Sequence, residues 1–317
     1  MRTITALFVG LGSIGTRHLK NLANLCADRG WTLQADALRS DLTRPLRPGA
    51  AELLHAQYTD LTAAPAHYDM VFITNPTSLH AEALRQVKGR GEALFIEKPI
   101  FSAEQTGLAL DELLPAGQKA YVAAPMRWCG AMLALKDRLP ALHPYCARVI
   151  CSSYLPDWRP GVDYRTVYSA RKALGGGVTI DLIHEWDYLV ELFGVPEKLY
   201  NFKGTYSKLE IDSDDLSVYI AKYPTLLAEV HLDYFGRGYR RSIELFCRDG
   251  SYLADFGKGT LTLPDGTVQH YEEDVNRRYE REMEYFVDYA LTGCGESCNP
   301  PALALKVLKL TLGENVQ

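Results

Sequence analysis

Short apolar runs recur through the first 124 residues, and a segment with helical spacing follows most of them. The runs cover residues 3–9, 32–38, 69–74, 93–96 and 121–124. Continuous apolar runs of this length are typical of strands buried on both faces. Amphipathic helices are predicted over residues 16–27, 78–87 and 102–114, the last with Ser102 and Gln105 as a capping box. Strands that alternate with helices predict a doubly wound parallel sheet, so the fold class is α/β.

The pattern changes in the second half, where apolar and polar residues alternate between turns. The alternating segments are residues 216–222, 226–234, 242–248 and 260–263. Pro264-Asp265-Gly266-Thr267 predicts a hairpin, and helices are expected over residues 275–291 and 301–312. This predicts an α+β domain with a large, mostly antiparallel sheet and helices on one face. We therefore expect two domains, residues 1–124 and 125–317.

Composition narrows the class of protein. The 317 residues are 47% hydrophobic and 23% charged, which excludes a disordered chain and a small disulfide scaffold. A net charge of −5 argues against a nucleic-acid partner. Seven scattered cysteines favour the reducing cytoplasm, and no apolar stretch approaches the roughly 20 residues that span a bilayer. No metal site is expected, because Cys294 and Cys298 lack further spaced ligands and are interpreted as loop thiols.

A glycine-rich loop joins the first predicted strand to the first helix. Gly10, Gly12 and Gly15 form the pattern G-x-G-x-x-G in the strand–loop–helix context that a dinucleotide-binding fingerprint requires. Gly10 would allow a tight turn, Gly12 a close approach of a pyrophosphate, and Gly15 close packing of helix on strand. Ser13 and Ile14 begin the helix, whose partial positive charge would face the phosphates.

The end of the second strand decides which dinucleotide is preferred. An acidic residue there binds the ribose hydroxyls of NAD, whereas an Arg accommodates the 2′-phosphate of NADP. Arg39 and Ser40 stand at this position and favour NADP, while Asp36 falls inside the strand. In the alternative interpretation Arg39 is a solvated loop residue and Asp41 contacts the ribose of NAD.

Candidate catalytic residues come from two segments. Lys98, in Glu97-Lys98-Pro99, follows a predicted strand at the carboxyl edge of the sheet, where it could donate a hydrogen bond to a substrate hydroxyl. Asp181 and His184 follow three consecutive glycines, 175–177, and their i, i+3 spacing predicts that they share one helix face. The carboxylate could then orient the imidazole, which is a suitable base near pH 7.

Aromatic and arginine residues are concentrated just before these glycines. Aromatic faces pack on sugar rings, and a guanidinium can bind a carboxylate or phosphate. The candidate substrate-binding residues, beside Lys98, Asp181 and His184, are Arg127, Trp158, Tyr164, Arg165 and Tyr168. The alternative is a solvated loop whose tyrosines pack at a domain interface.

The order of these motifs resembles that of the Gfo/Idh/MocA-type oxidoreductases. The resemblance covers nearly the whole chain and rests on four motifs: Gly10-x-Gly12-x-x-Gly15, Asn75-Pro76 with His80, Glu97-Lys98-Pro99, and Gly175-Gly176-Gly177 leading to Asp181 and His184. One difference is that only Leu182 and Ile183 separate the Asp from the His, whereas the family pattern has three residues there.

The resemblance implies an N-terminal Rossmann domain and a C-terminal domain with an open-faced sheet. It implies hydride transfer between NADP or NAD and a secondary alcohol or ketone of a sugar, cyclitol or nucleotide sugar. Lys98 is then the acid/base lysine, Asp181 and His184 the catalytic pair, and the oligomer a homodimer or homotetramer. Asn75, His80, Glu97 and Lys98 join the cofactor-binding candidates. A redox-neutral enzyme with tightly bound nucleotide, or a catalytically silent NAD(P)-binding regulator, remain alternatives.

Overall fold

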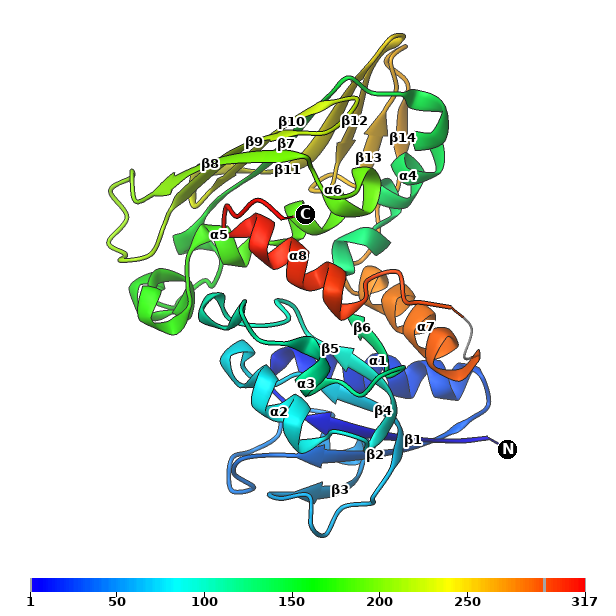
Figure 1. Cartoon of the computed structure of the whole chain (residues 1–317). Coiled ribbons are helices and arrows are strands. Elements are labelled where there is room, and N and C mark those ends of the chain that lie inside the picture. Colours follow the sequence, from blue (N-terminus) through cyan, green and yellow to red (C-terminus); the bar gives the residue numbers. More distant parts are fainter. Residues whose placement is uncertain (1, 293–294, 317) are drawn as a thin grey trace. The chain divides into compact units, whose positions relative to one another are not determined.

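The computed structural model describes residues 2–292 and 295–316, and the chain divides into two compact units, each with its own sheet (Figure 1). The first unit comprises Met1–Ala123 and Tyr279–Leu305, and the second comprises Ala124–Arg278 and Lys306–Gln317. The expected division placed all of residues 125–317 in one domain, whereas the chain enters the first unit again at Tyr279.

The first unit contains a six-stranded sheet in the order β3-β2-β1-β4-β5-β6, and every paired strand in it is parallel. Its strands are β1 Thr3–Val9, β2 Thr32–Leu38, β3 Leu54–Tyr58, β4 Tyr68–Ile73, β5 Gly91–Ile96 and β6 Lys119–Val122. The predicted doubly wound parallel sheet is confirmed. The strand order reverses between β1 and β4, and ligands of such sheets bind beyond the carboxyl ends of strands at this point.

Helices of the first unit follow its strands, as the alternation predicted. They are α1 Ser13–Asp28, α2 His80–Gln86 and the short α3 Leu110–Leu113, with most of α7 Asn276–Thr292 and the first residues of α8 Pro301–Thr311. The prediction of one helix over residues 102–114 is wrong. The capping box of Ser102 and Gln105 starts only a 3₁₀ turn, Ala103–Gln105. Gly107 lies between this turn and α3, and glycine is unfavourable inside a helix.

An aromatic cluster explains why α7 returns to the first unit. The rings of Phe8 and Phe72 stack with centroids 4.4 Å apart. Phe286 of α7 packs edge-on against Phe72 and Phe95, at 5.4 and 5.2 Å. Phe286 is completely buried, and its burial accounts for roughly 1.5–3 kcal/mol of hydrophobic stabilisation. The apolar face of α7 therefore completes the core of the parallel sheet.

The second unit contains an eight-stranded sheet in the order β14-β13-β12-β11-β7-β10-β9-β8. Its strands are β7 Cys146–Tyr154, β8 Lys198–Gly204, β9 Leu216–Lys222, β10 Leu227–Asp233, β11 Phe235–Cys247, β12 Gly250–Asp255, β13 Thr260–Thr262 and β14 Val268–His270. All neighbours pair antiparallel except β7 and β10, which confirms the predicted mostly antiparallel sheet. The Pro264–Thr267 turn joins β13 to β14 as expected.

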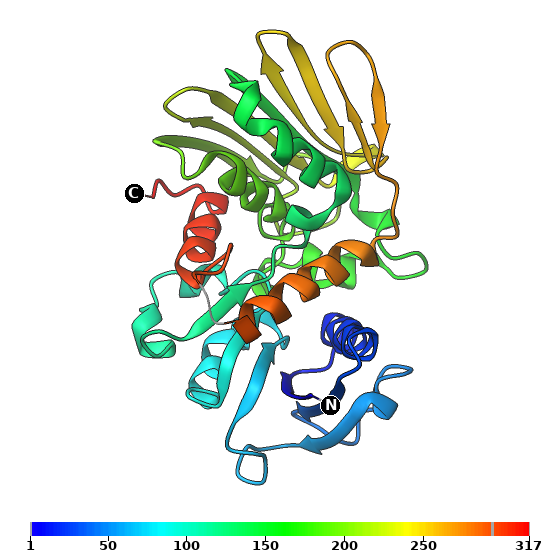
Figure 2. The same ribbon diagram turned by 90° about the vertical axis from the view of Figure 1, so that its right-hand side faces the viewer.

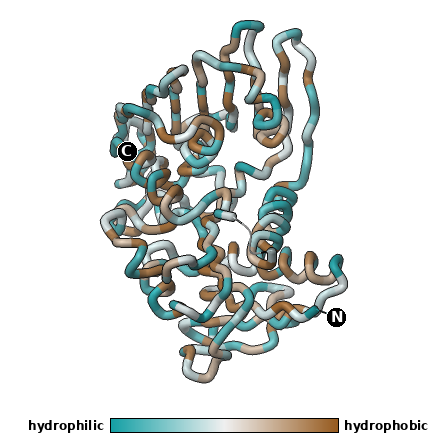
Figure 3. The backbone as a smooth tube through the Cα atoms, turned by 45° about the vertical axis from the view of Figure 1, so that its right-hand side comes forward, coloured by the Kyte–Doolittle hydropathy of each residue, from teal (hydrophilic) through white to brown (hydrophobic). Residues whose placement is uncertain are grey.

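The two faces of this larger sheet differ in burial. On one face Val149, Tyr219 and Leu245 are completely buried, and the helices α4 Gly130–Leu142, α5 Val178–Asp181 and α6 His184–Phe193 lie on this side (Figure 2). The opposite face carries the alternate residues, among them Phe202 at 72% and Ile220 at 37% exposure. Hydrophobic and hydrophilic positions accordingly alternate along these strands (Figure 3).

Candidate active site

The glycine loop of the first unit has the geometry that a dinucleotide requires. Gly10 adopts φ +89°, and a Cβ there would lie 2.8 Å from the Asn75 Cα. A Cβ on Gly15 would lie 2.6 Å from both the Gly10 carbonyl oxygen and the Thr74 hydroxyl oxygen. A Cβ on Gly12 would meet no atom within 4 Å. Gly10 and Gly15 are therefore needed for the turn and the packing, whereas Gly12 leaves open space beside the backbone.

The start of α1 fits an anionic ligand as well. Gly12 is the N-cap residue, and no side chain caps the first turn, which begins with Ser13 and Ile14. The amide groups of an uncapped first turn and the helix dipole favour negative charge at this end. The side chains around the loop leave buried polar atoms without a partner, namely Thr16 Oγ1 and Asn75 Oδ1. The loop, the helix start and these atoms together fit the pyrophosphate of a dinucleotide.

Arg39 directly follows β2 and borders a basic hollow of about 430 Å³. Its guanidinium donates to Gln57 Oε1 at 2.7 Å and to the Arg44 carbonyl, and Arg44 and Arg47 also line the hollow. Ser40 is exposed beside it. Asp36 is buried within β2 and accepts a hydrogen bond from the Tyr68 hydroxyl at 2.9 Å, so it is not available to a ribose.

Asp41 is engaged within its own loop. Its Oδ1 accepts hydrogen bonds from the Thr43 backbone amide, at 2.8 Å, and from the Thr43 hydroxyl. These hydrogen bonds lower the pKa of the Asp41 carboxyl. Arg39, rather than Asp41, thus lies at the residue after the strand and lines the hollow.

Glu97 and Lys98 lie just beyond β5, at the carboxyl edge of the sheet. Glu97 is buried, and its Oε1 lies 2.6 Å from His18 Nε2. Burial alone would raise the pKa of Glu97, but the hydrogen bond and attraction of His18 bring it below its ordinary value. The backbone amide of Lys98 donates to Glu97 Oε2 at 3.1 Å, and the Lys98 side chain is half-buried. The Lys98–Pro99 peptide bond is cis.

His80 connects two loops of the first unit through its imidazole ring. It is 1% exposed, with Nδ1 and Nε2 each 3.1 Å from a carbonyl oxygen, those of Ile100 and Asn75 respectively. Burial lowers the pKa of its imidazole. His80 therefore ties the Asn75-Pro76 turn to the segment after Lys98. Its two ring nitrogens are occupied by these contacts within the protein.

In the second unit, Asp181 and His184 do not share one helix. Asp181 ends α5 and His184 begins α6, so the prediction of a single helix face is wrong. Leu182 and Ile183 between them are 5% and 4% exposed, and the chain turns here so that two consecutive apolar side chains are buried. Both Asp181 and His184 nevertheless line the same cavity.

The Asp181 carboxylate is bound by two tyrosines. Its Oδ2 accepts a hydrogen bond from the Tyr234 hydroxyl at 2.6 Å, and its Oδ1 accepts one from Tyr168. Burial, followed by the negative charge of Asp181, raises the pKa of both phenols. The two hydroxyls are therefore donors at neutral pH, and they fix the carboxylate at the wall of the cavity.

The cavity around His184 has a volume of about 590 Å³ and lies entirely within the second unit. Trp158, predicted as a substrate contact, lines it; its indole donates to Ser153 Oγ at 3.0 Å and packs edge-on against Tyr234. Tyr164 and Arg165 are not among its lining residues.

The Arg165 guanidinium is bound elsewhere. Its Nη1 donates to Glu210 at 2.6 Å, and its Nη2 donates to Asp163 at 2.9 Å. The Tyr164 hydroxyl accepts from the Glu210 backbone amide at 3.2 Å. These two predicted substrate residues therefore join the loop before α5 to Glu210.

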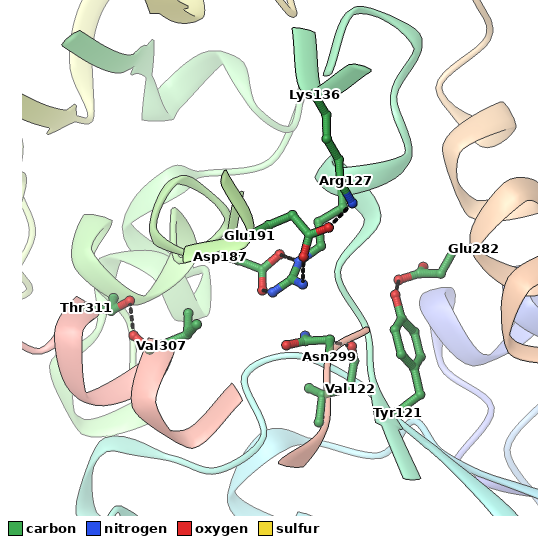
Figure 4. A network of polar contacts seen from close by, with 10 residues as sticks. All are labelled: Tyr121, Val122, Arg127, Lys136, Asp187, Glu191, Glu282, Asn299, Val307 and Thr311. Atoms are coloured by element: carbon green, nitrogen blue, oxygen red, sulfur yellow. Dashed lines mark hydrogen bonds and ion pairs between the residues drawn. The ribbon is translucent and has the colours of Figure 1, made fainter. Parts of the chain in front are cut away.

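Arg127 is buried beneath α6 and forms an ionic network (Figure 4). Its Nε and Nη2 donate to the two oxygens of Asp187, at 2.9 and 2.8 Å. Its Nη1 donates to Glu191 at 2.5 Å, and Glu191 also pairs with Lys136. At 3% exposure Arg127 joins the 3₁₀ turn Pro125–Trp128 to α6, the helix that His184 begins, instead of presenting its guanidinium to a ligand.

The same close-up shows contacts within each unit that are not part of the cavity. In the first unit Tyr121 donates to Glu282 at 2.8 Å, and Asn299 donates to the Val122 carbonyl at 2.9 Å (Figure 4). These bonds attach the late segment of the chain to β6. They explain how residues far apart in sequence complete the first unit.

Sequence reasoning missed the residues that β11 contributes to the cavity. Arg237, Tyr239 and Arg241 line it, together with Tyr154 from the end of β7. Arg241 is neutralised by Glu185, with contacts of 2.7 and 3.1 Å. The signal that could have found them is Gly236-Arg237-Gly238, because glycines inside an alternating strand indicate a bulge, and bulges often lie next to active sites.

No helix in the described part of the chain is both long and apolar enough to cross a membrane. Among residues 2–292 and 295–316, no group of three or more His, Cys, Asp or Glu side chains is gathered as metal ligands would be. Cys294, the partner that the sequence suggested for Cys298, lies outside the described residues.

Comparison with known proteins gives the family context. Residues 4–123 match the family model described as an oxidoreductase family with an NAD-binding Rossmann fold. The chain is 24% identical over 308 residues to an uncharacterised oxidoreductase, YrbE, of Bacillus subtilis, covering 90% of this chain and 86% of that protein. It is 26% identical to inositol 2-dehydrogenase of Rhizobium meliloti over 200 residues, 61% of this chain and 56% of the relative.

A solved structure shows the same fold over nearly the full length. This is an oxidoreductase from Agrobacterium radiobacter in complex with NAD+, L-tartaric acid and magnesium, with a TM-score of 0.79 and 17% identity. The match covers 98% of this chain and 95% of that one. At this identity the similarity shows the fold, and it extends across both units.

Proposed function

We propose that the chain is an NAD(P)-dependent dehydrogenase or reductase of the Gfo/Idh/MocA type, because residues 4–123 match the model of an oxidoreductase family with an NAD-binding Rossmann fold. Its proposed substrate is a secondary alcohol or ketone of a sugar, cyclitol or nucleotide sugar. The observation that carries this proposal is the cavity of the second unit, where His184, Asp181 and an aromatic face at Trp158 are gathered. The resemblance to inositol 2-dehydrogenase supports a polyhydroxylated substrate.

His184 is the proposed general base. A bound nicotinamide supplies the chemistry of accepting a hydride from the carbinol carbon or returning it to the carbonyl. As the carbinol is oxidised, its hydroxyl proton passes to the His184 imidazole, and the C–O bond becomes a carbonyl. In the direction of reduction the protonated imidazole returns that proton to oxygen. Proton transfer by a positioned side chain accelerates such a step by about 10²–10⁴-fold.

Asp181 and Lys98 have supporting roles in this proposal. The Asp181 carboxylate, fixed by Tyr168 and Tyr234, supplies negative charge that stabilises the imidazolium of His184 when it carries the proton. The Lys98 ammonium donates a hydrogen bond to the reacting oxygen and stabilises the charge that develops there. Glu97, whose backbone neighbour is Lys98, binds His18 and so fixes the segment that carries the lysine.

For the dinucleotide we propose NADP as the preferred form. The glycine loop and the start of α1 would hold the pyrophosphate, as their geometry fits this group. Arg39, with Arg44 and Arg47 around the same hollow, would bind the 2′-phosphate. We further propose the cytoplasm as the location and a homodimer or homotetramer as the assembly, with the open sheet face as the contact surface.

The test of this function measures nicotinamide absorbance of the purified full chain with sugars, inositols and nucleotide sugars. We expect His184→Asn and Lys98→Met to lower kcat by at least about 10²-fold, while the binding of NADPH by the His184→Asn variant stays unchanged. The matched controls are His67→Asn and Lys88→Met, because both residues make surface contacts in the first unit.

Two outcomes would contradict the assignment. Wild-type turnover in both His184→Asn and Lys98→Met would remove the proposed acid–base chemistry. A chain that converts sugars with tightly bound nucleotide and no net absorbance change would instead be redox-neutral. Mass spectrometry of the denatured protein would identify such a bound nucleotide.

A further inference from the structure

Arg237 differs from the other arginines around the cavity that His184 lines. Its guanidinium lies over the Tyr154 ring, 3.7 Å from the ring centroid, and no carboxylate in the described chain pairs with it. Arg241 in the same cavity is neutralised by Glu185, and Arg165 is bound by Asp163 and Glu210. Arg237 is exposed and is one of the residues that line the cavity.

A bulge in β11 places Arg237 over Tyr154. Phe235 pairs with Tyr154 and Arg240 pairs with Ser152, so five residue steps on β11 oppose two on β7. Asp233 Oδ1 fixes the start of the bulge by accepting from the backbone amides of Phe235 and Gly236, at 3.0 and 2.7 Å. A bulge redirects the side chains that it carries, and here it turns Arg237 toward the cavity.

The sequence of the bulge is specific to this geometry. A Cβ on Gly236 would lie 1.9 Å from Ser152 Oγ, so a larger residue there would displace the Ser152 side chain. The Tyr154 ring contacts the Arg237 guanidinium through a cation–π interaction, and a guanidinium can offer a fork of two N–H donors. Such a fork matches the oxygens of a carboxylate or a phosphate.

The other charges of the cavity are consistent with an anionic group at Arg237. Asp157 is exposed at the rim, and Asp181 is occupied by the hydroxyls of Tyr168 and Tyr234. Arg237 is thus the cation of the cavity wall that has no anion in the described chain. Aromatic surface for a sugar ring is present beside it at Trp158, which lines the same cavity.

We propose that the substrate carries an anionic group, a carboxylate or a phosphate, and that Arg237 binds it in the cavity of His184. The identity of the substrate as a sugar rests on the proposed function, whereas the binding of an anion at Arg237 stands on the geometry of the bulge. Arg237 is in this proposal a specificity-determining residue that selects sugar acids, sugar phosphates or nucleotide sugars over neutral sugars.

A second location for the anion has to be distinguished. Arg237 also borders a hollow of about 550 Å³ on the open face of the sheet, which Arg148 and Arg240 line as well. Arg148 is paired there with Glu229 at 3.0 Å. Arg240 lies on the same strand as Arg237 and lines the open-face hollow, but it is not among the residues that line the cavity of His184. Arg240→Gln is therefore the matched control.

The experiment is isothermal titration calorimetry of the full chain in the presence of NADPH. The probes are D-glucose, D-glucuronate, glucose 6-phosphate and UDP-glucose. We expect at least one anionic probe to bind ten- to hundredfold more tightly than glucose, the range that a charge-assisted fork provides. Arg237→Gln should remove this preference, and Arg240→Gln should keep it. A response to glucuronate identifies the carboxylate, and a response confined to the other two identifies the phosphate.

Three outcomes would overturn the proposal. In the first, the anionic probes bind no more tightly than glucose. In the second, Arg237→Gln still prefers the anionic probes to glucose. In the third, Arg237→Gln and Arg240→Gln lose this preference equally, which would place the anion on the open face. Nicotinamide absorbance is followed in parallel. Binding through Arg237 without hydride transfer would refute the proposed function alone. Equal turnover of an anionic probe by wild type and Arg237→Gln would refute this proposal alone.

Discussion

A single arginine decides the expected nucleotide preference. Arg39 follows β2, donates to Gln57 and faces a hollow that Arg44 and Arg47 also line. We expect Arg39→Asp to weaken NADPH binding by at least about tenfold, because a charge-assisted contact to the 2′-phosphate becomes a repulsion. NADH binding should change little. Tryptophan-fluorescence titration measures the affinities for NADPH and NADH, and Arg90→Asp is the control. If Arg39→Asp weakened the binding of both nucleotides equally, Arg39 would not be the residue that reads the 2′-phosphate.

Glu97 gives a prediction about pH at the same scale. The pKa of the folded-state carboxyl lies below its ordinary value of 4.5, because the attraction of His18 outweighs the effect of burial. Ionised Glu97 therefore stabilises the fold above pH 4.5, and this contribution is lost as the pH falls through the lower folded-state value.

The corresponding variant is Glu97→Gln. We expect it to lower the free energy of unfolding by about 1–3 kcal/mol at pH 7, with a difference from wild type that shrinks below pH 4.5. Urea unfolding at several pH values measures this difference. Glu92→Gln is the control, since Glu92 forms an exposed pair with His67 and should contribute less than about 1 kcal/mol. A difference in unfolding free energy between wild type and Glu97→Gln that is the same at every pH would contradict the lowered pKa of Glu97.

At the scale of elements, the strand–loop–helix start of the chain separates folding from binding. A Cβ on Gly15 would meet backbone and the Thr74 hydroxyl at 2.6 Å, whereas a Cβ on Gly12 meets nothing. We expect Gly15→Ala to destabilise the first unit by about 1–3 kcal/mol. Gly12→Ala should leave the melting temperature unchanged and weaken NADPH binding, because the added methyl occupies the space that a pyrophosphate needs.

Differential scanning fluorimetry with and without NADPH measures both effects, and each glycine variant serves as the control of the other. Equal melting temperatures with equal NADPH affinity in the two variants would contradict the separate roles of Gly12 and Gly15. A loss of stability in Gly12→Ala would show that the loop packs more tightly than its geometry indicates.

Local patterns explain which elements could be predicted. The buried strands of the parallel sheet consist of continuous apolar residues, and β1 and β2 begin and end at the predicted residues. The long β7 and the short β12 escaped prediction because their burial depends on partners distant in sequence. Asp181 and His184 were expected on one helix face but lie on two different helices, and both line one cavity. Arg237 could not be placed, because its direction depends on a bulge whose register only β7 fixes.

Arg127 illustrates the limit of reasoning from residue type. A guanidinium beside the last strand of the first unit suggested a substrate contact, yet Asp187 and Glu191 bind it beneath α6. Both carboxylates lie on the helix that also starts with His184, and their spacing of four residues places them on one face. A buried arginine with two carboxylate partners is a feature of packing, and sequence alone did not pair them.

At the scale of the whole molecule, the open face of the larger sheet predicts self-association. Its outer strands expose Tyr200, Phe202 and Ile220, and Tyr200 pairs directly with Ile220 across β8 and β9. The opposite face of the same strands is completely buried at Tyr219 and Ala221. Apolar side chains exposed together on a sheet are typical of a protein–protein contact surface.

We expect the protein to sediment as a dimer or larger, with this face as the contact. The double variant Phe202→Glu/Ile220→Glu should shift the species toward the monomer, because charged side chains at the core of an apolar interface lack partners there. Analytical ultracentrifugation measures the shift, and Tyr145→Glu, an exposed aromatic residue just before β7, is the control. A wild-type monomer would remove the proposed interface. A monomeric double variant that keeps NADPH binding would show that the parallel sheet folds and binds independently of the contact on the larger sheet.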